Sequence, residues 1–157
     1  MHIALIAIGS RGDVQPYVAL GRGLKESGHD VCVVTHAIFE NFVRNAQLDF
    51  GLIRQNPQQA LQSNLGQAAL KNNGVHSLQS FSKLINQSLP QIFTDVLAAC
   101  ETQDALIASP LAYYCAPHIA DKLGIPLINA YTLPVHSTRR FPNYLFATAQ
   151  RRGAFYN

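Results

Sequence analysis

The sequence predicts an α/β fold in which a parallel β-sheet is flanked by helices. Short, nearly continuous apolar runs occur at residues 2–8, 31–35, 105–108 and 125–131, and residues 49–53 form a fifth candidate strand. Such runs are typical of parallel strands that are buried on both faces. Between them, apolar residues recur at the three- and four-residue spacing of amphipathic helices. This alternation indicates right-handed βαβ units, which build either an open sheet or half of a barrel.

The first predicted helix follows a glycine-bearing loop, residues 9–13, and is expected to end at Gly28, a favourable C-cap residue. Two further glycines, Gly21 and Gly23, lie inside this helix, where each costs about 1 kcal/mol relative to alanine. We expect close packing of the helix on the sheet to offset the cost at both positions.

A helical insertion interrupts the α/β pattern after the third strand. Residues 55–91 contain eight Gln and five Asn but no Asp or Glu. Apolar residues continue at helical spacing from Leu78 to Cys100, and Pro90 should kink or divide that helix. The pattern then resumes with a strand, a helix over residues 112–123, and Gly124 as the C-cap of that helix.

Length and composition indicate one globular domain of ordinary size. The chain has 157 residues, of which 48% are hydrophobic, which is enough for a core. No apolar run approaches the roughly 20 residues that span a bilayer, and we expect no secretory leader before the first strand. The cysteines Cys32, Cys100 and Cys115 form neither a disulfide framework nor a metal motif, and the histidines lack metal-ligand spacing. We therefore expect a cytoplasmic protein without a metal site.

Positive charge gathers at the end of the chain. Residues 1–138 contain eight Lys or Arg and nine Asp or Glu, whereas residues 139–157 contain four Arg and no acidic residue. The overall charge of +3 is too small to indicate nucleic-acid binding. Arginines near an anionic bilayer would give weak, salt-sensitive adsorption, so peripheral membrane contact is one expectation. Solvated charge, or pairing with another domain, is the alternative.

The most informative segment is the loop after the first strand, Gly9-Ser10-Arg11-Gly12-Asp13-Val14-Gln15-Pro16. In a doubly wound sheet, ligands bind where loops leave the carboxyl ends of the strands. A dinucleotide site is disfavoured, because the glycines follow a GxxG spacing and the second strand ends in Thr35 and His36 rather than an acid. A phosphate loop is also disfavoured, since no Gly-Lys-Ser/Thr follows and Asp13 would repel an anion at the helix N-terminus.

Asp13 has two chemical roles open to it. As an N-cap, its carboxylate would accept backbone N–H groups of the first helical turn, with Pro16 inside that turn. As a general base, it would accept a proton from a substrate hydroxyl held above the strand ends. The residues alone leave both roles open.

The same loop carries a resemblance to a known family. Residues 9–17 (GSRGDVQPY), together with later segments in the same order, resemble the start of two-domain (GT-B) glycosyltransferases, most closely the sterol 3-beta-glucosyltransferases. The later segments are Ala19-Leu20-Gly21, Gly28-His29, Val33-Val34-Thr35-His36, Ser109-Pro110, Gly124-Ile125-Pro126, Thr132-Leu133-Pro134, Thr138-Arg139, Phe141-Pro142 and Gln150-Arg151-Arg152-Gly153. The resemblance implies a Rossmann-like, acceptor-binding N-terminal domain that spans residues 1–157.

A partner domain is implied by the same resemblance. It would be a C-terminal domain of similar architecture that binds a nucleotide sugar, typically UDP-glucose, and it is absent from residues 1–157. No cofactor is expected apart from this sugar donor. The chain stops at Asn157 without an obvious closing element, so we expect it to be a fragment that folds but transfers no sugar by itself.

The candidate site residues rest partly on the resemblance and partly on the place of each residue at a strand end or on the insertion helix. Asp13 stands where more distant relatives place a histidine base, which makes it the candidate catalytic residue. Its loop neighbours Gly9, Ser10, Arg11 and Gly12 are expected close to the acceptor or the donor. Further candidates for acceptor contact or for assistance to the base are His36, Phe81, Tyr113, Thr132 and His136.

An apolar pocket would suit a sterol, which offers one hydroxyl on a large apolar body. The insertion helix could wall such a pocket with Phe81, Leu84, Ile85 and Phe93. Plain core packing is the alternative use of this apolar stripe.

The predicted function is that of the acceptor-binding half of an inverting glycosyltransferase, which transfers a hexose to a hydroxyl of a sterol or other lipophilic acceptor. One alternative keeps this chemistry but changes the acceptor to an antibiotic or other natural-product aglycone. A second alternative is a non-catalytic lipid-binding module of the same fold. A third, a dinucleotide-dependent enzyme, would require an acid near Thr35.

Overall fold

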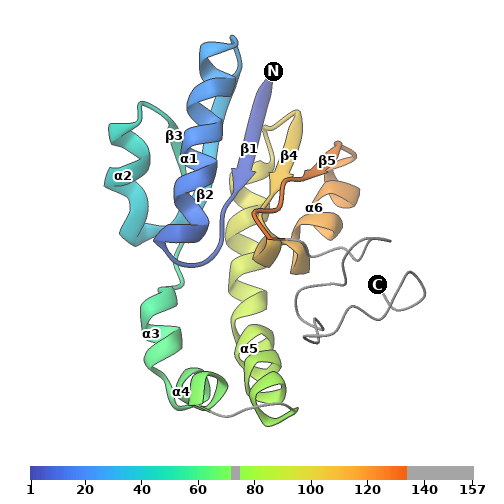
Figure 1. The fold of residues 1–157 in the computed structure, drawn as a ribbon. Coiled ribbons are helices and arrows are strands. Elements are labelled where there is room, and N and C mark those ends of the chain that lie inside the picture. Colours follow the sequence, from blue (N-terminus) through green and yellow to red (C-terminus); the bar gives the residue numbers. More distant parts are fainter. Residues whose placement is uncertain (72–74, 134–157) are drawn as a thin grey trace, which may run out of the picture.

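The computed structural model describes residues 1–71 and 75–133, which alternate between strands and helices (Figure 1). In chain order the elements are β1 (His2–Ile6), α1 (Arg11–Glu26), β2 (Asp30–His36), η1 (Ala37–Phe39), α2 (Glu40–Asn45), β3 (Asp49–Ile53), α3 (Pro57–Gln62), α4 (Asn64–Lys71), α5 (Val75–Cys100), β4 (Ala105–Ala108), η2 (Pro110–Tyr114), α6 (Ala116–Leu123) and β5 (Leu127–Asn129). The five predicted strands are therefore confirmed. β2 is longer than its predicted range, whereas each of the other strands is as long as its predicted range or shorter.

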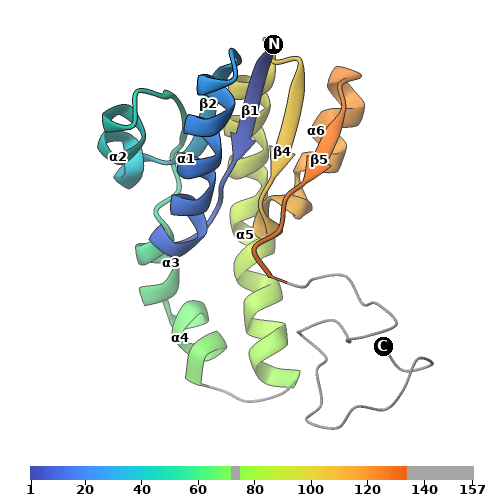
Figure 2. The same ribbon diagram turned by 45° about the horizontal axis from the view of Figure 1, so that its top comes forward.

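The strands form one open parallel sheet in the order β3-β2-β1-β4-β5, which decides between the open sheet and the half barrel (Figure 2). Ile3 in the central strand β1 pairs with Val31 of β2 on one side and with Ala105 of β4 on the other. The chain thus builds outward from β1 to β3 and then returns to the other side of β1. The reversal creates a topological switch point between β1 and β4.

Helices cover both faces of the sheet and give it two buried cores (Figures 1 and 2). Side chains alternate along β1, because successive residues of a strand point to opposite faces. Leu5 packs in the core that includes Tyr17 of α1, whereas Ile6 packs in the core that includes Val96 of α5 and Ile119 of α6. Full burial of such aliphatic side chains contributes about 1.5–3 kcal/mol each.

The two glycines inside α1 behave differently. At Gly21, a Cβ atom would lie 2.9 Å from Leu48 Cδ1 and 3.0 Å from Leu5 Cδ1, so the absence of a side chain lets the helix approach the sheet closely. The predicted packing role is confirmed there. At Gly23 it is wrong: a Cβ would meet no atom within 4 Å, because this residue lies on the exposed side of the helix.

Pro90 does not divide the insertion helix, because α5 runs continuously from Val75 to Cys100. Proline removes one backbone N–H from a helix, and its cost must be offset by packing. The carboxyl half of α5 supplies that packing, since Ile92, Val96 and Cys100 are all buried against the sheet. None of the helices within residues 1–71 and 75–133, α5 included, is both long and apolar enough to cross a membrane.

The helix predicted over residues 112–123 is divided into η2 and α6. Cys115 between them has non-helical backbone angles, and Pro117 occupies the first turn of α6, where proline is tolerated. Gly124 ends α6 in the left-handed conformation, with φ of +68°, as predicted for a glycine C-cap.

The insertion projects beyond the carboxyl edge of the sheet. Helices α3 and α4 and the amino-terminal half of α5 lie past the ends of β1, β2 and β3, and the carboxyl half of α5 lies behind the sheet (Figures 1 and 2). The insertion and the loops after the strands therefore face each other at this edge.

Candidate functional site

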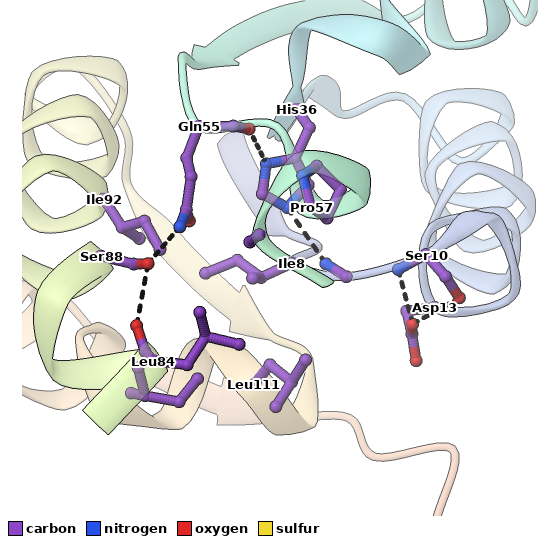
Figure 3. A pocket seen from close by; sticks show the side chains of 13 residues that line it. Ile8, Ser10, Asp13, His36, Gln55, Pro57, Leu84, Ser88, Ile92 and Leu111 are labelled. Carbon is purple, nitrogen blue, oxygen red and sulfur yellow. Dashed lines mark hydrogen bonds between the residues drawn. The ribbon is translucent and has the colours of Figure 1, made fainter. Parts of the chain in front are cut away.

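A cavity of about 300 Å³ opens at the carboxyl edge of the sheet, where the loops after β1, β2 and β3 meet the insertion (Figure 3). This volume is at the lower end for ligand pockets. The lining residues come from segments far apart in the sequence: Ile8, Gly9, Ser10, Asp13, His36, Gln55, Pro57, Ala60, Leu84, Ile85, Ser88, Ile92 and Leu111. Its position beside the switch point is where doubly wound sheets bind ligands.

One wall of the cavity is apolar and is built mainly by α5. Leu84 and Ile92 of α5 lie across from Ile8, with Leu111 of η2 beside them (Figure 3). The polar groups of the neighbouring Gln55 and Ser88 satisfy each other: the Gln55 amide donates to Ser88 Oγ, which donates in turn to the Leu84 carbonyl oxygen at 3.0 Å. This wall therefore suits an apolar ligand surface.

The rim of the cavity carries a carboxylate, that of Asp13. The residue is half-buried at the third position of α1, and its Oδ2 atom accepts from the Ser10 backbone N–H at 2.7 Å and from Ser10 Oγ–H at 2.8 Å. Of the two roles open to Asp13, the N-cap role is wrong, because the helix begins earlier and Ser10 occupies that position. Asp13 instead reaches back to the cap residue, as acidic residues at the third helical position do.

Both bonds from Ser10 fall on the same oxygen of Asp13. Within residues 1–71 and 75–133, no donor forms a hydrogen bond to Oδ1. In Figure 3 the second carboxylate oxygen points away from Ser10. The helix therefore holds the carboxylate by one oxygen and leaves the other available to a ligand.

Gly9 is the residue against which Asp13 packs. Its φ is +132°, a conformation that residues with a Cβ rarely adopt, and a Cβ there would lie 2.5 Å from Asp13 Oδ2. Only glycine fits this close approach.

His36 lies at the carboxyl end of β2 with 1% of its surface exposed. Its Nε2 accepts the Gly9 N–H at 3.2 Å, so the ring proton is on Nδ1, which donates to the Gln55 carbonyl oxygen at 2.6 Å. Burial lowers the pKa of His36 from its ordinary value, and the bond to the Gln55 carbonyl opposes that shift. A neutral imidazole thus connects the loop after β1 with the loop after β3 (Figure 3).

Tyr17 ties α1 to the far side of the switch point. It lies one helical turn after Asp13, is 2% exposed, and its hydroxyl donates to the Ala130 carbonyl oxygen just after β5. Burial, with smaller contributions from Asp13 and Tyr131, raises the pKa of Tyr17 to about 12. The phenol is therefore a structural donor and stays protonated at neutral pH.

Comparison with known proteins places the chain in a family. Residues 3–142 match the glycosyltransferase family 28 N-terminal domain. The chain belongs to this family. A sterol 3-beta-glucosyltransferase of Candida albicans is 36% identical over 156 residues, which cover 99% of this chain and 10% of that protein. This family 28 domain therefore spans about a tenth of the length of that relative.

Solved structures share its fold. The calicheamicin glycosyltransferase superposes with a TM-score of 0.68 at 15% identity, over 87% of this chain and 34% of that one. A glycosyltransferase of Streptomyces sp. SF2575, solved with thymidine diphosphate, gives 0.64 at 23% identity, over 83% and 38% of the two chains. The domain thus has the Rossmann-like sheet of one half of a GT-B glycosyltransferase, as its sequence predicted.

The family 28 domain brings only part of the predicted site to the cavity. Gly9, Ser10, Asp13 and His36 line it together. Arg11 does not, because its guanidinium lies 5.1 Å from the ring centroid of Phe42, on the α2 side of the helix.

The remaining predicted residues are exposed or fall outside the description. Gly12, Tyr113 and Thr132 are exposed and do not line the cavity. The side chain of Phe81, which lies on α5, and the whole of His136 are outside the described residues.

The proposed apolar wall is half correct. Leu84 and Ile85 line the cavity, whereas Phe93 packs against the core beneath α5 instead. Phe93 lies more than two helical turns after Leu84 and Ile85, and the orientation of α5 on the sheet decides which of these side chains face the cavity.

Sequence reasoning missed several residues of the site. Gln55 follows the third strand by two residues, so the rule that ligands meet the carboxyl ends of strands could have indicated it. Ser88 and Leu111 carried no such signal. Among the described residues, no group of three His, Cys, Asp or Glu side chains is arranged to hold a metal ion.

Proposed function

We propose that this domain is the acceptor-binding half of an inverting glycosyltransferase, which transfers glucose from UDP-glucose to the hydroxyl of a sterol or other lipophilic acceptor. The observation that carries the proposal is an apolar cavity whose described lining includes one carboxylate, that of Asp13, and one oxygen of this carboxylate accepts no bond from a described residue. An acceptor with an apolar body and one hydroxyl matches this combination. The sterol 3-beta-glucosyltransferases among the relatives support the same acceptor class.

In this proposal Asp13 acts as the general base. The acceptor body lies against Leu84, Ile85 and Ile92, and its hydroxyl donates to Asp13 Oδ1. As the hydroxyl oxygen bonds to the anomeric carbon of glucose, its proton passes to Asp13 and the bond from that carbon to the UDP oxygen breaks. Attack from the side opposite UDP inverts the anomeric configuration.

The donor would be held mainly by a C-terminal domain that faces this cavity. Positioning two substrates against each other supplies much of the rate enhancement in such reactions. The 157-residue chain alone should therefore bind acceptor but transfer no sugar. The four arginines of residues 139–157 would add weak contact with anionic membranes, where lipophilic acceptors reside. In this proposal the enzyme is cytoplasmic and binds such membranes peripherally.

Replacement of Asp13 with Asn tests the proposal in a protein that joins this domain to its C-terminal half. Turnover with radiolabelled UDP-glucose and a sterol should fall by roughly two to four orders of magnitude, the usual contribution of a general base. Folding should be preserved, because the Asn oxygen can still accept the Ser10 N–H. Asp121→Asn on the exposed surface of α6 removes the same charge outside the cavity and serves as the matched control.

An Asp13→Asn protein with nearly unchanged turnover would show that the carboxylate only supports the helix. A panel that also contains polyketide and glycopeptide aglycones distinguishes the acceptor classes, because a natural-product enzyme would prefer those over sterols. Absence of any transfer by the unmodified two-domain protein would favour a lipid-binding module.

A further inference from the structure

The loop that leads from β1 into α1, and so to Asp13, is anchored by two buried side chains at the ends of neighbouring strands. The parallel ladder ends at Ala7, whose N–H donates to the Val34 carbonyl oxygen at 3.0 Å. The next two amides have side-chain partners: Ile8 N–H donates to Ser109 Oγ at 3.2 Å, and Gly9 N–H donates to His36 Nε2 at 3.2 Å. The ends of β4 and β2 thus hold the loop from both sides.

His36 is fixed in turn by the loop after β3. Its Nδ1–H donates to the Gln55 carbonyl oxygen at 2.6 Å, and the ring is almost completely buried. Both ring nitrogens are therefore occupied by backbone groups. In this arrangement His36 has no lone pair with which to accept a proton from a ligand in the cavity.

Gly9 couples the position of the His36 ring to that of the Asp13 carboxylate, because it contacts both. The space that a Cβ of Gly9 would fill is occupied by the Asp13 carboxylate, whose Oδ2 would lie 2.5 Å from such an atom. The next residue, Ser10, donates both its N–H and its hydroxyl to that same oxygen. A displacement of the Gly9 amide therefore moves both the surface on which the carboxylate rests and the donors that hold it.

We infer that His36 is a positioning residue for sugar transfer: by accepting the Gly9 N–H, it fixes the loop that directs the Asp13 carboxylate into the cavity. This inference rests on the proposed function, in which Asp13 is the base. It replaces the prediction that His36 assists the base directly, because the Gly9 amide already uses the lone pair that such assistance requires.

Two conservative substitutions separate the bonds that His36 makes. A Gln side chain places its terminal oxygen close to the position of the imidazole Nε2, so His36→Gln can still accept the Gly9 N–H. An Asn side chain reaches only as far as Nδ1, so His36→Asn can donate to the Gln55 carbonyl but leaves the Gly9 amide without a partner. Each variant loses one of the two buried bonds, which makes the two proteins a matched pair for stability.

The activity test uses the protein that joins this domain to its C-terminal half, with UDP-glucose and a sterol. His36→Asn should lower kcat by about 10- to 100-fold, and His36→Gln should stay within roughly threefold of wild type, because a small misplacement of a reacting group is costly. The KM for UDP-glucose should not change in either variant. His29→Gln, which removes a histidine just before the opposite end of β2, is the control and should leave kcat unchanged.

The second test needs no activity and uses the 157-residue chain. Exchange of the Gly9 amide with deuterated solvent, followed by NMR, should be faster in His36→Asn by about tenfold or more, and close to wild type in His36→Gln. In the unmodified chain, the nitrogen chemical shifts of the His36 ring should identify the tautomer with its proton on Nδ1. This measurement applies even if both variants fail to fold.

The two readouts distinguish failure of the inference from failure of the proposed function. If the unmodified two-domain protein transfers no sugar, the proposed function fails, while amide exchange and the ring tautomer still test the anchoring of the loop. If sugar is transferred but the Asn and Gln variants lose kcat equally, His36 has only a structural role. A ring proton on Nε2 at neutral pH would overturn the inference outright.

Discussion

Substitution of Gly9 with Ala perturbs the candidate site at one defined point. The methyl group would be introduced at a φ of +132° and 2.5 Å from Asp13 Oδ2. Backbone strain of this kind costs about 1–3 kcal/mol. The carboxylate must also rotate away from Ser10, which loses the helix-end contact and adds about 1 kcal/mol.

The expected cost is therefore about 2–4 kcal/mol, which lowers the melting temperature of a domain of this size by roughly 6–12 °C. Thermal unfolding of the 157-residue chain, followed by circular dichroism, measures this directly. Gly23→Ala is the matched control, because a Cβ there meets no atom within 4 Å in the exposed part of α1. It should raise stability by about 0.5–1 kcal/mol, the helix propensity difference between glycine and alanine.

The sign of the difference between the two glycine variants is the decisive result. A Gly9→Ala protein that melts at the wild-type temperature would refute the argument that the loop and the Asp13 carboxylate leave no room for a side chain. In the two-domain protein, the same substitution should reduce turnover even at temperatures where the domain remains folded, because the carboxylate has been displaced.

Two further predictions concern Tyr17 and His36. Tyr17→Phe should lower the free energy of unfolding by about 1 kcal/mol, because the Ala130 carbonyl loses its donor; urea unfolding measures this, and an unchanged midpoint would mean that water replaces the bond at no cost. The pKa of His36 is lower in the folded protein than the ordinary value of 6.5, so just below pH 6.5 the unfolded chain binds a proton that the folded chain does not. The contribution of neutral His36 to the free energy of unfolding should therefore be fully present above pH 6.5 and be lost as the pH falls toward the folded-state pKa of this residue. His36→Gln lacks this contribution, and parallel stability curves for the two proteins between about pH 5 and pH 8 would contradict it.

Much of the scaffold follows from local sequence. The five strands coincide with short apolar runs, and Gly124 ends α6 in the left-handed conformation that a glycine C-cap allows. The sequence predicts Gly9–Asp13 as the ligand segment because it follows a buried strand, and its last three residues form the start of α1. These features depend on residues that are neighbours in the chain, and local periodicity and capping chemistry therefore predict them.

The tertiary structure decided which side chains meet. Whether Ser10 or Asp13 caps α1 depends on a helix start that differs by three residues, and whether Phe93 or Leu84 faces the cavity depends on the rotation of α5 against the sheet. The bond between Gly9 and His36 joins residues 27 apart, and the bond between Ile8 and Ser109 joins residues 101 apart. Both depend on the parallel register that places the ends of β1, β2 and β4 side by side, because that register determines which polar side chain stands opposite each amide beyond the ladder.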